Sequence, residues 1–142
     1  SGLVARDMKL RFMRLGVICE ALTDADGFAW TTSILDKNCL VIGFSLSGQT
    51  PSIIDSLIDA KGMGAKTVLI TGQPDLIKED FSEIIPVAMQ SKPQFIQRIS
   101  AQFPMLLMID ILYAFFLEID REKIFNSYWE NHKLNGYYRR HQ

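Results

Sequence analysis

Apolar residues recur along the chain at two spacings, one typical of helices and the other of buried strands. Helical spacing runs through residues 3–15 and stops at Gly16, a residue that is typical of a helix end. Short continuous apolar runs predict strands at residues 17–22, 39–44, 67–71 and 83–89. Further helices are predicted from Thr23 or Asp24 to Leu35, from Pro51 to about Gly62, as a short turn at 76–81, and from 92 to about 129.

The alternation of strands and helices indicates the fold class. Continuous apolar strands separated by helices are typical of a parallel sheet that is covered on both faces. Pro86 lies inside the last apolar run and places that strand at an edge or an irregularity. We therefore predict an α/β three-layer sandwich, with a mostly parallel sheet and helices on both faces, formed by a single domain over residues 1–142.

Composition narrows the class of protein. The 142 residues are 48% hydrophobic and carry a formal net charge of −1, which argues against disorder and against a broad nucleic-acid-binding surface. Cys19 and Cys39 both lie in apolar runs, so we expect two small buried thiols rather than a disulfide or a metal pair. No secretory segment opens the sequence, and we expect a cytoplasmic domain with no metal and no redox cofactor.

The long apolar run at residues 103–119 approaches the length of a membrane-spanning helix. It contains Pro104 and Asp110 and is shorter than the roughly 20 residues that usually span a membrane. We therefore predict a buried or interfacial helix there, and no membrane association.

The sequence FSLSGQTP at residues 44–51 lies where a predicted strand gives way to a helix. In a parallel sheet, ligands bind beyond the carboxyl ends of the strands, and a helix N-terminus favours an anion. Gly48 permits a close approach of the backbone. The candidate anion ligands are the side chains of Ser45, Ser47, Gln49 and Thr50 with nearby N–H groups, and phosphate is the natural occupant. The alternative is that these ordinary turn and cap residues only satisfy the backbone.

The same residues carry a family resemblance. SLSGQT after LVIGF, followed by DSLIDAKGMGAKTVLIT, resembles the sugar isomerase (SIS) domain, in which S-x-S-G-x-T holds a sugar phosphate. QRISAQFPMLLMIDILYAFFLEI resembles the late helices of RpiR-type regulators that respond to sugar phosphates. The resemblance implies a flavodoxin-like topology and phosphate contacts from Ser45, Ser47 and Thr50. Gln49 occupies a position that is often glutamate, and Ser1 matches a serine that would form the other wall of the pocket.

The sequence departs from this family in two ways. The usual first strand is missing, because the sequence begins at the loop that should follow that strand. The helix-turn-helix domain that precedes the sugar-binding domain in the regulators is also missing. DNA binding is therefore expected only through a domain that these residues do not contain.

Two function classes remain open, a phosphosugar sensor and an isomerase that interconverts aldose and ketose phosphates. Isomerisation needs a general base, most often a histidine or a glutamate. The two histidines, His132 and His141, lie in a polar C-terminal stretch that we expect to be exposed, and the glutamates nearest to strand or helix ends are Glu20, Glu79 and Glu83. No acid–base pair is recognisable, which favours the sensor, although a pair assembled across a dimer interface would escape notice.

Three further residues are candidates to line the sugar. Thr71 and Gly72 follow a predicted strand at the same edge as the 44–51 loop, although a plain turn explains them equally well. Arg98 matches an arginine that is common in the regulators, and an exposed arginine is the alternative. Aromatic residues in the C-terminal helical region predict a homodimer, because they are too apolar for a lone helix: Phe115, Phe116, Phe125, Tyr128, Trp129, Tyr137 and Tyr138.

Overall fold

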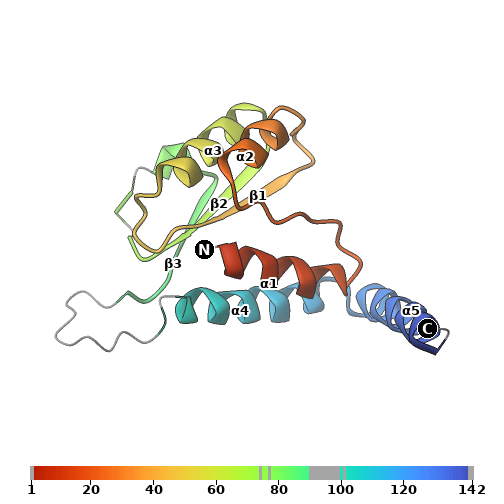
Figure 1. Cartoon of the computed structure of the whole chain (residues 1–142). Coiled ribbons are helices and arrows are strands. Elements are labelled where there is room, and N and C mark those ends of the chain that lie inside the picture. The colour runs from red at the N-terminus through yellow and green to blue at the C-terminus, as the bar shows by residue number, and fades with distance from the viewer. Residues whose placement is uncertain (1, 74, 77, 90–99, 101, 141–142) are drawn as a thin grey trace.

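The computed structural model describes residues 2–73, 75–76, 78–89, 100 and 102–140, and the backbone alone for 134–140. Five α-helices and three strands alternate along this part of the chain (Figure 1). The elements are α1 (Gly2–Met13), α2 (Ala25–Thr32), β1 (Leu40–Phe44), α3 (Pro51–Gly62), β2 (Lys66–Thr71), the 3₁₀ turn η1 (Lys78–Asp80), β3 (Glu83–Pro86), α4 (Phe103–Ile119) and α5 (Arg121–Arg140).

The sheet has its strands in the order β1-β2-β3, and both pairs are parallel. Phe44 of β1 lies opposite Ile70 of β2, which lies opposite Ile85 of β3. Pro86 ends β3, which pairs on one side only within this sheet, so the prediction of an edge strand is confirmed.

One face of the sheet is covered by α3. Leu57 of α3, Leu69 of β2 and Phe81 form a buried cluster, with Val41 and Ile53 packed against it. Pro51 lies at the first position of α3, where its missing N–H costs no helical hydrogen bond. Figure 1 shows α2 beside α3 on this side of the sheet. Asp24 is the residue that caps α2, because its carboxylate accepts a hydrogen bond from the Gly27 N–H at 2.7 Å.

The other face of the sheet is covered by α1 and α4. Their buried residues meet the strands in one cluster that contains Val4, Phe12, Phe44, Ile70, Met105 and Ile109. Leu69 and Ile70 point to opposite faces because successive side chains of a strand alternate. Helices therefore cover both faces, and the predicted three-layer α/β architecture is confirmed.

The predicted strand at residues 17–22 is wrong. The segment forms no strand, although its side chains alternate: Val17 and Cys19 pack against the α1–α4 cluster, while Ile18 is fully exposed. A strand requires a neighbour for its N–H and C=O groups, and no described strand lies in register with this segment. The apolar run thus favours an extended backbone without supplying a pairing partner.

The C-terminal region also differs from the prediction. Helical structure was expected from residue 92 to about Trp129; in the described residues it forms two helices that meet at Asp120, and the second continues beyond the expected end to Arg140. The polar stretch that was expected to be an exposed tail is therefore helical up to that residue. The start of the predicted helix, at residues 92–99, lies outside the described residues. Over the described parts of the chain, no helix has the length and apolar character needed to cross a membrane.

Candidate functional site

The 44–51 loop and the turn after β2 meet at one edge of the sheet. Because β1 and β2 are parallel, both segments leave from carboxyl ends of strands. The Ser45 N–H donates to the Ile70 carbonyl at 3.1 Å, and the Gly72 N–H donates to the Leu46 carbonyl at 3.0 Å. These two hydrogen bonds hold the loop and the turn side by side.

The first serine and the threonine of the SLSGQT sequence face each other. The hydroxyls of Ser45 and Thr50 lie 2.9 Å apart in a hydrogen bond, and Ser45 is almost completely buried. Thr50 is the N-cap residue of α3, but its side chain makes no capping hydrogen bond. Its hydroxyl is therefore held toward the loop rather than toward the helix.

This arrangement leaves donors at the start of α3. The N–H groups of Ile53 and Ile54 both bond to the Thr50 carbonyl, whereas those of Thr50 and Ser52 meet no acceptor among the described residues. Unpaired N–H groups at a helix N-terminus, together with the helix dipole, form a favourable environment for an anion.

Gly48 makes the tight turn of the loop possible. Its φ is +65°, and a Cβ there would lie 3.0 Å from the Leu76 Cδ1 and 3.1 Å from the Thr71 Oγ1. Ser47 and Gln49, on either side of it, are exposed, and the Gln49 N–H donates to the Ser47 hydroxyl at 3.2 Å. The turn thus presents two polar side chains outward while its backbone packs against the neighbouring turn.

The candidate sugar-lining residues lie in different environments. Thr71 is fully buried, and its hydroxyl accepts a hydrogen bond from the Gln73 N–H at 3.1 Å. Gly72 packs so closely that a Cβ would lie 2.9 Å from the Leu46 carbonyl oxygen. The structure thus brings Thr71 and Gly72 next to the 44–51 loop. Ser1 and Arg98, the other two candidates, lie outside the described residues.

The described ionisable side chains supply no buried acid or base. Where the structure describes side chains, the buried polar residues are Ser45, Thr67 and Thr71. The Glu20 carboxylate receives a hydrogen bond from Lys9 at 2.6 Å and another from the Ala21 N–H, and these lower its pKa. Burial raises the pKa of the Cys19 thiol, which keeps it protonated and poorly nucleophilic.

The remaining candidate acids and bases of the described residues lie at the surface. His132 is exposed on α5, and Glu79 and Glu83 are exposed as well. No group of three side chains that could ligate a metal ion comes together among the described residues. Both cysteines are free and half-buried, so the expectation of unpaired thiols holds but their burial is only partial.

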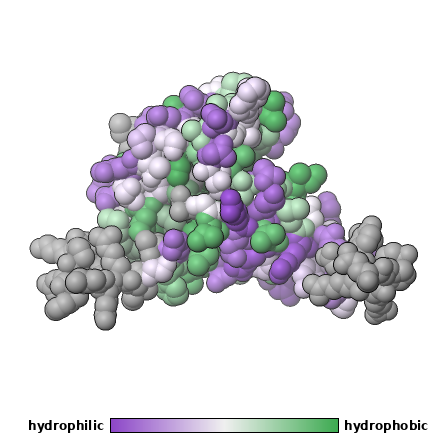
Figure 2. Space-filling model, in the orientation of Figure 1, coloured by the Kyte–Doolittle hydropathy of each residue, from purple (hydrophilic) through white to green (hydrophobic). Residues whose placement is uncertain are grey.

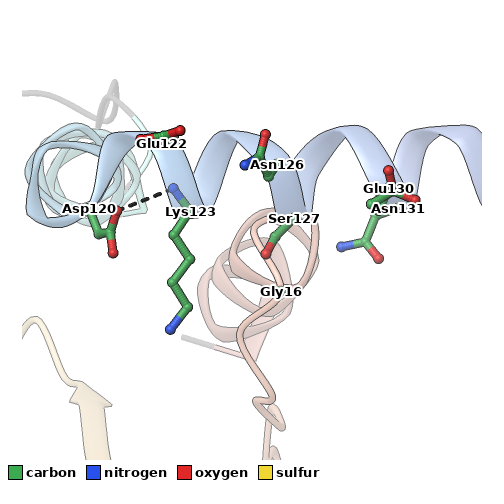
Figure 3. A pocket seen from close by; sticks show the side chains of 8 residues that line it. All are labelled: Gly16, Asp120, Glu122, Lys123, Asn126, Ser127, Glu130 and Asn131. Atoms are coloured by element: carbon green, nitrogen blue, oxygen red, sulfur yellow. Dashed lines mark hydrogen bonds between the residues drawn. The ribbon is translucent and has the colours of Figure 1, made fainter.

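A cavity of about 590 Å³ lies away from the loop, between the turn at Gly16 and α5. In Figure 3, Lys123, Ser127 and Asn131 project from α5 toward this turn. The Asn131 amide donates to the carbonyls of Met13 and Arg14, at 3.5 and 3.3 Å, which are carbonyls at the C-terminal end of α1. The cavity is therefore a junction in which α5 caps α1, and the 44–51 loop remains the candidate binding site.

The family model for the SIS domain matches residues 1–113, which include all of this loop. The chain belongs to the SIS domain family. Its fold is similar to that of a solved structure, the Vibrio vulnificus NanR protein complexed with ManNAc-6P. The chain superposes on it with a TM-score of 0.81 at 22% identity, over 94% of this chain and 50% of that one.

Further similarity links this SIS domain to transcriptional regulators. The sugar isomerase domain of an RpiR transcription factor from Sphaerobacter thermophilus superposes with a TM-score of 0.80 at 17% identity, over 94% of this chain and 73% of that one. An HTH-type regulator of Clostridium perfringens is 27% identical over 80% of this chain and 41% of its own length. The Escherichia coli regulator RpiR is 32% identical over 50% of this chain and 24% of its own length. The SIS domain therefore spans less than half of these curated relatives.

Sequence reasoning found the loop but missed the contacts that hold it. The Leu46 carbonyl and the Gln73 N–H support the site through hydrogen bonds to Gly72 and Thr71. Any residue except proline carries these backbone groups, so no side-chain signal in the sequence identifies them. Only the proximity of the two parallel strands could have predicted the contact.

Proposed function

We propose that this SIS domain binds a sugar phosphate at the Ser45–Thr50 loop and serves as the ligand-sensing domain of an RpiR-type transcriptional regulator in the cytoplasm. The phosphate would accept hydrogen bonds from the Ser47 and Thr50 hydroxyls, from Gln49 and from the free N–H groups at the start of α3. Ser45 would orient Thr50 from beneath.

The observation that carries this proposal is the geometry of the loop. The Ser45–Thr50 hydrogen bond holds the threonine hydroxyl off the helix, and two N–H groups at the N-terminus of α3 lack acceptors among the described residues. Donors gathered at a helix N-terminus suit the charge of a phosphate. NanR, which has the same fold, was solved with a sugar phosphate, which supports this class of ligand.

Sensing is favoured over isomerisation by the ionisable groups. An aldose–ketose isomerase needs a base whose pKa is poised for proton transfer. The pKa of Glu20 is instead lowered by its hydrogen bond from Lys9, and no described histidine or carboxylate is buried. Binding without turnover fits these groups best.

The proposed partners follow from the relatives. DNA would be bound only by a helix-turn-helix domain elsewhere in the full regulator, since the relatives are HTH-type regulators of which this chain spans less than half. Two copies of the SIS domain would associate through their C-terminal helices.

Calorimetric titration of Ser47→Ala and Thr50→Ala tests the binding site. The titrants are sugar phosphates, including ManNAc-6P, and their unphosphorylated parents. We expect each substitution to weaken phosphosugar binding by about 1–3 kcal/mol, because each removes a hydrogen bond to a charged group. The unphosphorylated parents should bind neither variant nor the wild-type chain.

Ser56→Ala is the matched control, because the Ser56 hydroxyl bonds to the Ser52 carbonyl within α3. It should bind like the wild-type chain. Equal affinity in all four proteins would show that the phosphate lies elsewhere, and no binding of any phosphosugar would refute the sensor. Conversion of aldose to ketose phosphate on incubation would make the domain an isomerase.

A further inference from the structure

The turn after β2 holds a glutamine beside the candidate phosphate loop. Gln73 follows Thr71 and Gly72, and its N–H donates to the Thr71 hydroxyl oxygen at 3.1 Å. A Cβ on Gly48 would lie 3.1 Å from the Gln73 Cβ, so the side chain of Gln73 begins against the tight turn of the 44–51 loop. The backbone of Gln73 is thus fixed next to the residues that are proposed to hold the phosphate.

The carboxamide of Gln73 makes no hydrogen bond with the described residues. Its backbone N–H makes the one hydrogen bond that the residue forms with them, and the residue is half-buried. A carboxamide carries two N–H donors and an acceptor oxygen, and partial burial of these groups costs free energy unless they are paired. A ligand at this edge of the sheet would supply the partners.

The side of this turn toward β3 is closed by packing. A Cβ on Gly72 would lie 2.7 Å from the Cβ of Met89, which follows β3, and 2.9 Å from the Leu46 carbonyl oxygen. The Gly72 N–H is also occupied, because it donates to that carbonyl at 3.0 Å. A single methyl group has no room there, so a ligand meets the turn from the side of the 44–51 loop.

The position of Gln73 suits the sugar rather than the phosphate. The 44–51 loop and the turn leave from neighbouring parallel strands, which lie about 4.8 Å apart in a sheet. Gln73 is therefore set about one strand spacing from the phosphate loop, a step comparable to the width of a sugar ring. Both segments lie at the left in Figure 1, and Figure 2 shows mainly hydrophilic and neutral surface over that edge.

We propose that Gln73 determines which sugar phosphate binds, because its carboxamide hydrogen-bonds a hydroxyl on the part of the sugar that lies away from the phosphate. A hydroxyl both donates and accepts, so it pairs with either end of a carboxamide. A site built to bind a hydroxyl rejects an analogue that lacks it, since the polar group of the site is then left unpaired.

This inference rests on the proposed function and deepens it. The 44–51 loop would hold the phosphate that all such ligands share, whereas Gln73 would distinguish their sugars. The ligand is then a phosphorylated sugar with a free hydroxyl within reach of the turn after β2. Inorganic phosphate has no such hydroxyl, so its binding does not involve Gln73.

Calorimetric titration of Gln73→Met tests the proposal, because methionine keeps the length of the side chain and removes its amide. The probes are inorganic phosphate, measured by displacement, and whichever of ManNAc-6P, glucose 6-phosphate and fructose 6-phosphate binds the wild-type chain most tightly. We expect the dissociation constant of the sugar phosphate to rise about 10-fold, because a hydrogen bond is lost and the sugar hydroxyl is left unpaired. That of inorganic phosphate should stay within about twofold.

Asn126→Ala is the matched control. It removes an exposed carboxamide from α5, which Figure 1 shows at the opposite end of the molecule from the start of α3, so both probes should bind as they do to the wild-type chain. Deoxy analogues of the same sugar phosphate then identify the hydroxyl. Loss of the hydroxyl that Gln73 binds should weaken binding to the wild-type chain but change little in Gln73→Met, because both changes remove the same hydrogen bond.

The outcomes separate this inference from the proposed function. Unchanged affinity of Gln73→Met for the sugar phosphate would overturn the role of Gln73. An equal loss of affinity for inorganic phosphate would overturn it as well, because Gln73 would then support the loop rather than contact the sugar. A wild-type chain that binds none of the sugar phosphates would refute the proposed function, and this inference with it, before any variant is measured.

Discussion

Gly48→Ala probes the turn that holds the candidate site together. The φ of +65° lies in the left-handed region, where a residue with a Cβ costs about 1–2 kcal/mol more than glycine. The added methyl also meets the Thr71 hydroxyl oxygen at 3.1 Å and the Leu76 methyl at 3.0 Å, contacts tighter than most natural ones. Leu76 can yield, but Thr71 is fully buried and hydrogen-bonded to Gln73, so we expect a total cost of about 2 kcal/mol.

Thermal unfolding followed by circular dichroism measures this cost. For a domain of this size, 1 kcal/mol corresponds to about 3–4 °C in Tm, so Gly48→Ala should lower Tm by about 6–8 °C. Gly62→Ala is the matched control, because Gly62 ends α3 with ordinary φ and no neighbour within 4 Å of the added methyl. It should leave Tm unchanged or raise it slightly. Equal Tm values for the two variants would refute the strained turn.

Two other contacts give separate predictions. Asn131→Asp should lower the free energy of unfolding by about 0.5–1.5 kcal/mol in urea titrations, because it replaces a donor to the Met13 carbonyl by an anion. Asn126→Asp, on the same helix, is the control and should leave the free energy of unfolding unchanged. Since the pKa of Glu20 is lowered in the folded state, its contact with Lys9 should stabilise the fold above the ordinary glutamate pKa, about 4.3, and be lost as pH falls through the lowered value. Glu20→Gln should remove that pH dependence, which would persist if other groups caused it.

The sequence by itself determined the helices and strands whose signals are local. Pro51 and Asp24 start helices through their own chemistry, and Gly16 follows the end of α1 with a positive φ. The apolar runs that form β1 and β2 have neighbours to pair with, so their strands were predicted to within a residue. The SLSGQT loop was found for the same reason, because its residue types reflect the local demands of a tight turn at a helix N-terminus.

Tertiary structure decided which local tendencies were satisfied. The 17–22 run has the composition of a strand but no neighbour in the described sheet, so it forms no strand. From the sequence, Ser45 and Thr50 are equivalent candidates to contact the phosphate. In the structure, Ser45 is buried and the Thr50 hydroxyl is turned toward the loop. The sequence makes the outer and inner faces of α4 equally apolar. Only the packing of α1 and the sheet against the inner face decides which of the two is buried. Pairing and burial depend on residues far apart in the chain, and local spacing does not encode them.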